Sequence, residues 1–116
     1  MILLISSDLM VISTVENAAI SKAVKTQAAA SSEGISGKKL DTISLVMVDL
    51  ESAREDIGTI VSNLRTLMPS AKIVAFGPHV KVHALELAAE AGCDLVLARG
   101  QFFGQLNSIL EMGRAE

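Results

Sequence analysis

Four short apolar runs, separated by stretches with helical spacing, constrain the fold of this chain more than any other feature. The runs occupy residues 2–6, 44–49, 72–76 and 94–98. Each is almost continuously apolar, which is typical of parallel strands that are buried on both faces of a sheet. Strands of this kind that alternate with helices predict a parallel sheet with right-handed crossovers.

The stretches between the runs carry helix signals. We expect helices from Asp8, as a cap, to about Lys22, and over residues 53–68, 82–91 and 102–112. Pro69 should close the second helix and Gly92 should cap the third. The last helix has an apolar stripe that consists of Phe103, Leu106, Ile109 and Leu110.

Residues 25–31 and 32–42 give weaker signals. The first segment fits a weak edge strand by its place in the order, although its alanines suit a helix equally well. The second contains two glycines and should be a loop or one short helix. With the edge strand included, the chain fits a flavodoxin-like α/β fold. This is a doubly wound, five-stranded parallel sheet in the order 2-1-3-4-5, with helices on both faces.

Length and composition exclude several classes of function. The 116 residues suit a single domain over 1–116 without a separate output domain. A net charge of −3 and the absence of Trp and Tyr argue against nucleic-acid binding. The apolar run that ends at Ser6 is too short for a membrane span, and the lone Cys93 suits a reducing compartment. We therefore expect a cytoplasmic protein with neither a membrane nor a nucleic-acid partner.

Asp49 is the leading candidate for a functional residue. It ends the central apolar run, Leu45-Val46-Met47-Val48-Asp49. Open α/β sheets place their ligand sites at the carboxyl ends of the strands, where this carboxylate should lie.

Three segments of the chain resemble the receiver domains of response regulators, the CheY-like family of two-component signalling. They are Ile2-Leu3-Leu4-Ile5-Ser6-Ser7-Asp8, residues 45–50, and Ala91-Gly92-Cys93-Asp94-Leu95-Val96-Leu97-Ala98-Arg99. The resemblance covers nearly the whole length. It implies a phosphorelay protein in which Asp49 is the phospho-acceptor and Mg²⁺ assists phosphoryl transfer. The alternative is that Asp49 is an inherited carboxylate that forms an ion pair with Arg99.

The sequence departs from the family at most of the other functional positions. The acidic pair that holds Mg²⁺ aligns with Ser6 and Ser7, which leaves Asp8 and Asp49 as a weak metal site. The small hydroxyl residue after the fourth strand aligns with Gly77, and the lysine of the last strand with Arg99. The rotating aromatic residue of the family aligns with Val96.

We therefore expect an atypical receiver, or pseudo-receiver, that acts in signal transduction through protein–protein contacts. It should have no catalytic residues, should not be an enzyme and should need no cofactor. One alternative is a single-domain regulator phosphorylated on Asp49, with Mg²⁺ bound and with Asp8 and Arg99 in substitute roles. A second is a small-anion-binding domain, whose site would consist of Ser6, Ser7, Gly77 and Arg99.

The resemblance implies a partner surface on the expected helix 82–91, the last strand and the last helix. Neighbouring residues on a helix are about 100° apart, so Phe102 and Phe103 cannot both face inward. Either one of them is exposed to a partner, or Phe102 packs under the preceding loop. Lys81 and Gln105 complete the predicted surface. The resemblance implies a histidine kinase or a downstream effector as partner, and a monomer or a weak homodimer.

Overall fold

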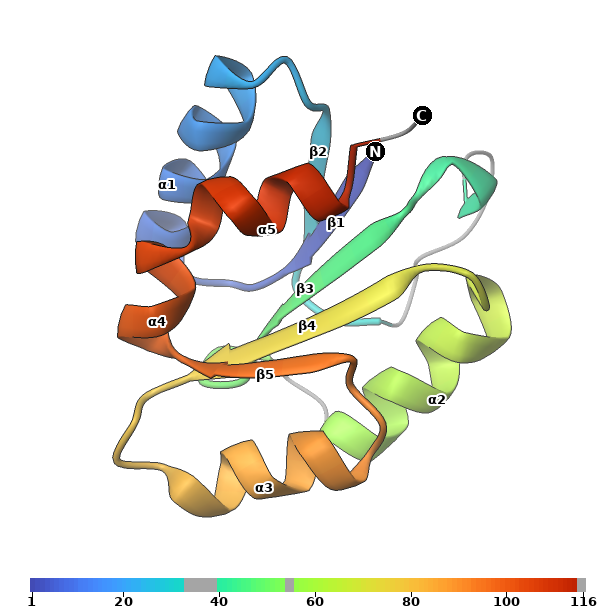
Figure 1. Ribbon diagram of the computed structural model, residues 1–116. Helices are drawn as coiled ribbons and strands as arrows, with labels where there is room; N and C mark the ends of the chain where they lie inside the picture. The colour runs from blue at the N-terminus through green and yellow to red at the C-terminus, as the bar shows by residue number, and fades with distance from the viewer. Residues whose placement is uncertain (33–39, 54–55, 115–116) are drawn as a thin grey trace.

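The computed structural model describes residues 1–32, 40–53 and 56–114, and its centre is a five-stranded parallel sheet (Figure 1). The strands are β1 (Ile2–Ile5), β2 (Thr26–Ala29), β3 (Leu45–Asp49), β4 (Lys72–Gly77) and β5 (Leu95–Ala98). They lie in the order β2-β1-β3-β4-β5, which confirms the flavodoxin-like fold predicted from the apolar runs. The predicted weak edge strand is β2, which pairs in parallel with β1 alone.

Helices cover both faces of the sheet (Figure 1). On one face lie α1 (Leu9–Ser21), α4 (Arg99–Gly104) and α5 (Leu106–Met112); on the other lie α2 (Ile57–Leu67) and α3 (Val82–Glu90). The segment 32–42 lies mostly outside the described residues, apart from Ser32 and a short 3₁₀ helix, η1 (Leu40–Thr42). Within the described part of the chain, no helix has both the length and the hydropathy to cross a bilayer.

Alternate residues of β1 pack into two separate cores, one on each face of the sheet. Ile2 and Leu4 pack with α1, α4 and α5, whereas Leu3 and Ile5 pack with α2 and α3. This is the two-residue periodicity of a strand, with both faces apolar because both are covered. The sheet is therefore held on both sides, and its carboxyl edge is positioned by two packed layers.

Side-chain capping sets the first turn of two helices. Asp8 caps α1 as predicted, because its Oδ1 accepts the N–H groups of Met10 at 2.9 Å and Val11 at 3.3 Å. The predicted start of the second helix at residue 53 is wrong. The helix begins at Ile57, where Asp56 accepts hydrogen bonds from both the N–H and the hydroxyl of Thr59.

The predicted last helix, 102–112, ends at Met112 as expected, but its start is wrong. It starts earlier, at Arg99, and is interrupted at Gln105 between α4 and α5. Gln101 permits the early start, because its Oε1 accepts the Ala98 N–H at 2.9 Å and so caps the helix directly after β5.

Candidate functional site

The site is centred on Asp49, which ends β3 in the middle of the sheet. Its strand lies between β1 and β4, and the side chain is 1% exposed. A buried carboxylate is costly unless hydrogen bonds replace its hydration, so its partners decide what the site can do.

Two serine hydroxyls and one backbone N–H replace that hydration. Oδ2 of Asp49 accepts hydrogen bonds from Ser6 Oγ at 2.9 Å and Ser52 Oγ at 2.8 Å. Oδ1 accepts the N–H of Glu51 at 3.1 Å. Both carboxylate oxygens are therefore engaged by the protein itself.

The same serines join the loop after β1 to the loop after β3. Ser6 is 2% exposed, and its hydroxyl also accepts the N–H of Asp8 at 3.1 Å. The N–H of Ser7 donates to Ser52 Oγ at 3.0 Å, and the Ser7 hydroxyl donates to the Ser52 carbonyl at 3.0 Å. Sequence reasoning missed Ser52, although a hydroxyl residue three positions after a strand-ending aspartate was a usable signal.

Arg99 does not pair with Asp49, so the predicted Asp49–Arg99 ion pair is wrong. The guanidinium lies 3.8 Å from Asp8 Oδ2 and 3.8 Å from Glu51 Oε1. It also lies over the ring of Phe103, with 5.4 Å from Cζ to the ring centroid. Arg99 is therefore partly exposed and makes weak ion pairs at the edge of the group formed by Ser6, Ser7, Ser52 and Asp49, the serine cluster.

Gly77 ends β4 and lies on the side of the sheet that α3 covers. A Cβ at this position would lie 3.3 Å from the Cβ of Leu50 and 3.7 Å from Cδ2 of Leu85. The structure thus brings Ser6 and Ser7 together around Ser52 and Asp49, while the nearest neighbours of a side chain at position 77 would be apolar. The four residues predicted to form an anion site therefore contact different parts of the structure and do not line one common site.

The predicted partner surface needs a correction at Phe102. Its ring is fully buried and stacks on Phe76, with centroids 3.8 Å apart and an interplanar angle of 11°. Phe103 is partly exposed and meets the Phe102 ring edge-on at 5.1 Å. Phe102 is thus the more deeply buried ring, with Phe103 packed at the edge of the same core. Lys81 and Gln105 are exposed.

Cys93 is the one thiol of the chain and does not supply a nucleophile to this site. It lies two residues before β5, in the turn that follows α3, and packs against the core of the α2 and α3 face. Burial raises the pKa of this thiol to about 11. It therefore remains protonated at neutral pH, and the protonated form is a poor nucleophile.

No protein-family model and no curated protein matches the chain. Solved structures of response regulators do match it. One is a response regulator from Thermotoga maritima, 14% identical with a TM-score of 0.70, covering 95% of this chain and 92% of that chain. Another is the receiver domain of NtrX from Brucella abortus, 14% identical with a TM-score of 0.74, covering 96% and 95%.

A third is the CheY-like receiver domain protein from Methanospirillum hungatei JF-1, 14% identical with a TM-score of 0.70, covering 96% of this chain and 94% of that chain. Each match spans nearly the whole of both chains. The structural neighbours are thus receiver domains, and the chain has the receiver-domain fold.

Proposed function

We propose that this chain is a receiver-like signalling domain that works through contacts with a partner protein and is not switched by Mg²⁺-dependent phosphorylation of Asp49. One observation carries the proposal. The Asp49 carboxylate is buried and accepts hydrogen bonds from Ser6 and Ser52, at the position where the resembled family holds a metal ion.

The engaged carboxylate supports this proposal on chemical grounds. Phosphoryl transfer needs an in-line approach to a carboxylate oxygen and cations that neutralise the developing charge. Both oxygens of Asp49 already accept hydrogen bonds, and the side chain is 1% exposed. A phosphoryl donor would have to reach a buried carboxylate and compete with these hydrogen bonds.

The residues around Asp49 also do not fit the magnesium site of receivers. Mg²⁺ prefers an octahedral set of carboxylate oxygens and waters. Ser6 directs its hydroxyl hydrogen to Asp49, and Asp8 is engaged by the first turn of α1 and by Arg99. In the ranges 1–32, 40–53 and 56–114, no group of three or more His, Cys, Asp or Glu side chains could hold a metal ion.

The two positions that bind the phosphoryl group in the resembled family also support the absence of a phosphorylation switch. Gly77 has no hydroxyl to bind a phosphoryl group, and Arg99 contacts Asp8 and Glu51 instead of Asp49. The fold would then serve as a binding scaffold, and its partner would be a histidine kinase or a downstream effector in the cytoplasm. We propose no enzymatic activity for the domain.

Incubation with acetyl phosphate and Mg²⁺, followed at once by intact-mass measurement, tests the proposal. We expect the mass to remain unchanged in the wild type. A gain of one phosphoryl group that the Asp49→Asn variant lacks would refute the proposal. A typical receiver domain treated in parallel shows that the reagent is active.

A further inference from the structure

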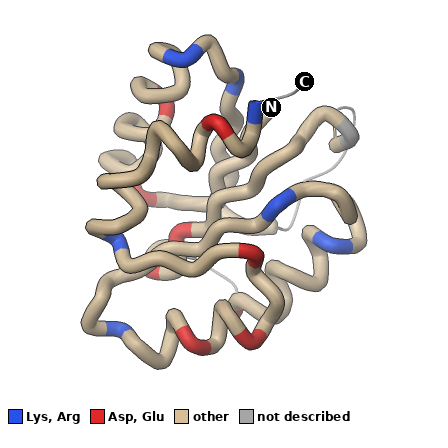
Figure 2. Tube along the Cα trace, in the orientation of Figure 1, with Lys and Arg blue, Asp and Glu red and all other residues tan. Residues whose placement is uncertain are grey.

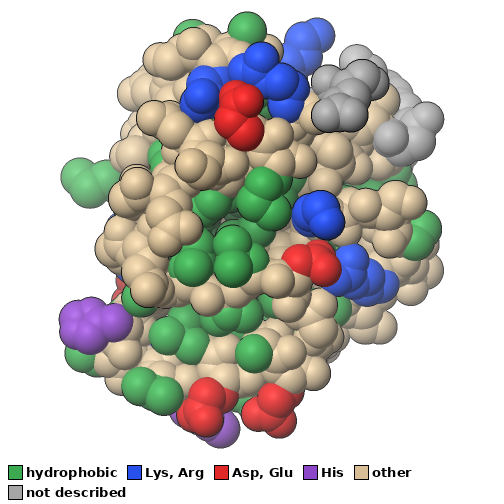
Figure 3. Space-filling view, in the orientation of Figure 1, with side chains coloured by type: hydrophobic (Ala, Val, Ile, Leu, Met, Phe, Trp, Pro, Cys, Tyr) green, Lys and Arg blue, Asp and Glu red, His purple; other side chains and the backbone are tan. Residues whose placement is uncertain are grey.

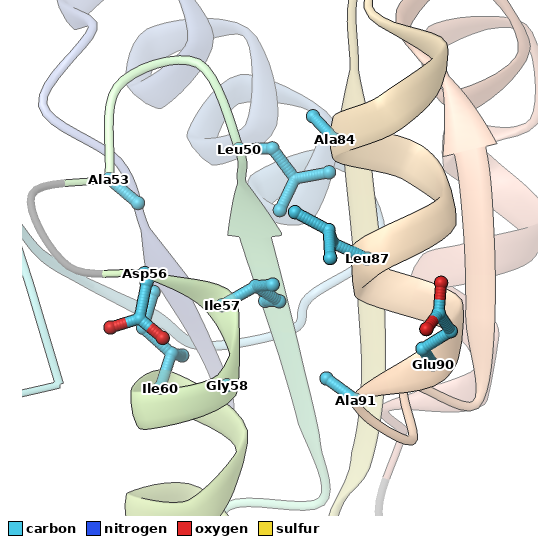
Figure 4. Close-up of a pocket in the computed structure, with 10 residues that line it drawn as sticks. All are labelled: Leu50, Ala53, Asp56, Ile57, Gly58, Ile60, Ala84, Leu87, Glu90 and Ala91. Atoms are coloured by element: carbon cyan, nitrogen blue, oxygen red, sulfur yellow. The ribbon is translucent and has the colours of Figure 1, made fainter.

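An apolar groove of about 470 Å³ lies between α2 and α3, on the face of the sheet opposite α1. Its volume falls in the usual range for binding pockets. Leu50, Ile57 and Leu87 point into the space between the two helices (Figure 4). Asp56 and Glu90 stand on the opposite walls, one on each side of this aliphatic floor.

The floor of the groove exposes aliphatic surface to solvent. Leu87 is 42% exposed, although it lies in the middle of α3 and points toward α2. A second apolar side chain against it would remove this surface from water, which is favourable. The groove is therefore suited to an aliphatic anchor.

The α3 helix carries two acidic residues, one of them at its C-terminal end, where negative charge is unfavourable. Glu90 ends α3, in the last turn, where the helix dipole favours cations, and Glu86 lies in the middle of the helix. Figure 2 shows acidic positions along this part of the chain. Within the described ranges neither has an ion-pair partner at 4.0 Å or less. Figure 3 shows acidic side chains over α3, with hydrophobic side chains beside them.

Asp56 adds negative charge on the other wall. Hydrogen bonds from the hydroxyl and the N–H of Thr59 lower the pKa of this carboxyl, which is therefore ionised at neutral pH. The groove thus presents an apolar floor between two carboxylates. A basic group that lies between the walls would interact favourably with both.

The distribution of polar groups favours a protein segment over a small molecule. Small-molecule sites usually have a few polar groups that converge on the ligand from inside the pocket. Here the polar groups stand on the rim, and the space between the helices is an open groove lined by aliphatic side chains. This arrangement is typical of a groove that receives the apolar side of a peptide segment.

We propose that this groove binds a basic amphipathic segment of a partner protein, with a leucine-like side chain on Leu50, Ile57 and Leu87 and a lysine or arginine beside Glu90. The proposal rests on the proposed function, in which the domain acts by protein contact. Leu50 directly follows Asp49, so the bound segment would contact the chain next to the serine cluster.

Binding of a short synthetic amphipathic peptide of leucines and lysines to the full chain tests this proposal. Backbone amide NMR follows the titration, and a counterpart peptide with every lysine replaced by glutamate serves as the ligand control. We expect saturable shifts that centre on Leu50, Ile57 and Leu87 with the basic peptide only. Equal binding of the acidic peptide, shifts centred on another surface, or no saturation would overturn the proposal.

Two matched pairs of variants sharpen the test. Glu90→Gln should weaken binding about 2- to 5-fold, as expected for one exposed ion pair. Glu86→Gln removes the same charge from α3 outside the groove lining and should change binding by less than about twofold. Equal losses from the two variants would show general charge attraction and would overturn the proposal.

Leu87→Ser should weaken binding about tenfold or more, because it removes most of a leucine anchor. Val82→Ser is its control, since Val82 is 58% exposed on the same helix and does not line the groove. A negative result in these peptide-binding experiments leaves the phosphorylation test unaffected, because that test measures protein mass rather than peptide binding.

Discussion

The Ser6 hydroxyl donates a 2.9 Å hydrogen bond to Oδ2 of Asp49, and both side chains are almost fully buried. The two residues are 43 positions apart in the sequence, at the carboxyl ends of neighbouring strands β1 and β3. In the receivers that the sequence resembles, the position of Ser6 carries an acidic metal ligand. A hydrogen bond from the Ser6 hydroxyl thus stabilises the Asp49 carboxylate. In the resembled family, a bound cation stabilises the corresponding carboxylate.

Removal of the Ser6 hydroxyl should destabilise the fold. Ser6→Ala leaves a buried carboxylate with one hydrogen bond fewer, and we expect a loss of about 1–3 kcal/mol in the free energy of unfolding. Ser7→Ala is the control, because Ser7 is exposed and should lose much less. Urea unfolding measures the free energy of unfolding of both variants. Equal decreases would show that the hydrogen bond to Asp49 contributes no more to stability than the contacts of Ser7.

Restoration of an acidic residue at position 6 should create a metal dependence. Ser6→Asp places two carboxylates side by side, so the variant should be less stable than the wild type in EDTA. Mg²⁺ should raise its melting temperature, because the cation offsets the repulsion. The wild type should show almost no Mg²⁺ effect, and an equal rise in both proteins would contradict the account.

Gly113→Ala should be strongly destabilising. A Cβ there would lie 2.6 Å from Cγ1 of Ile2 and 2.9 Å from Cβ of Leu45, where β1 and β3 begin. Overpacking of this kind costs about 1–3 kcal/mol. Gly104→Ala is the control, since no atom lies within 4 Å of its Cβ position and alanine favours the helix. Thermal unfolding that shows Gly113→Ala to be as stable as the wild type would contradict the close approach.

Acid should remove the stabilising contribution of Asp94. Burial raises the pKa of this carboxyl, but hydrogen bonds from the Ile73 N–H and Arg65, with the charges of Arg65 and Lys72, lower it below its usual 3.8. A lowered pKa in the folded state stabilises the protein above the unfolded pKa, and this contribution is lost as the pH falls through the folded pKa.

The wild type should therefore be more stable than Asp94→Asn near neutral pH, and the difference should shrink below about pH 4. Urea unfolding midpoints measured across this range give the comparison. A difference that stays constant with pH would show that the ionised form of Asp94 is not what stabilises the fold.

The sequence predicted most of the fold because its strands are apolar and short. The observed strands β1, β3, β4 and β5 agree with the four runs to within one residue at each end. Helix bounds were predicted less well. The start of α2 depends on capping by Asp56, and the break at Gln105 has no proline to signal it.

The site could be predicted only in part. The resemblance located Asp49, Ser6 and Ser7, since these positions follow from strand ends. Ser52 and the partners of Arg99 depend on how two loops fold over the sheet edge, and no periodicity encodes that. The burial of Phe102 likewise depends on a tertiary contact, the stacking of its ring on Phe76.

A titration of the protein with Mg²⁺ and beryllofluoride, followed by backbone amide NMR, tests the central claim most directly. With Asp49 held by Ser6 and Ser52, we predict no saturable shifts around Asp49, Asp8 and Arg99. Saturable shifts at these residues that spread to α5 would show a working phospho-switch and would contradict the account.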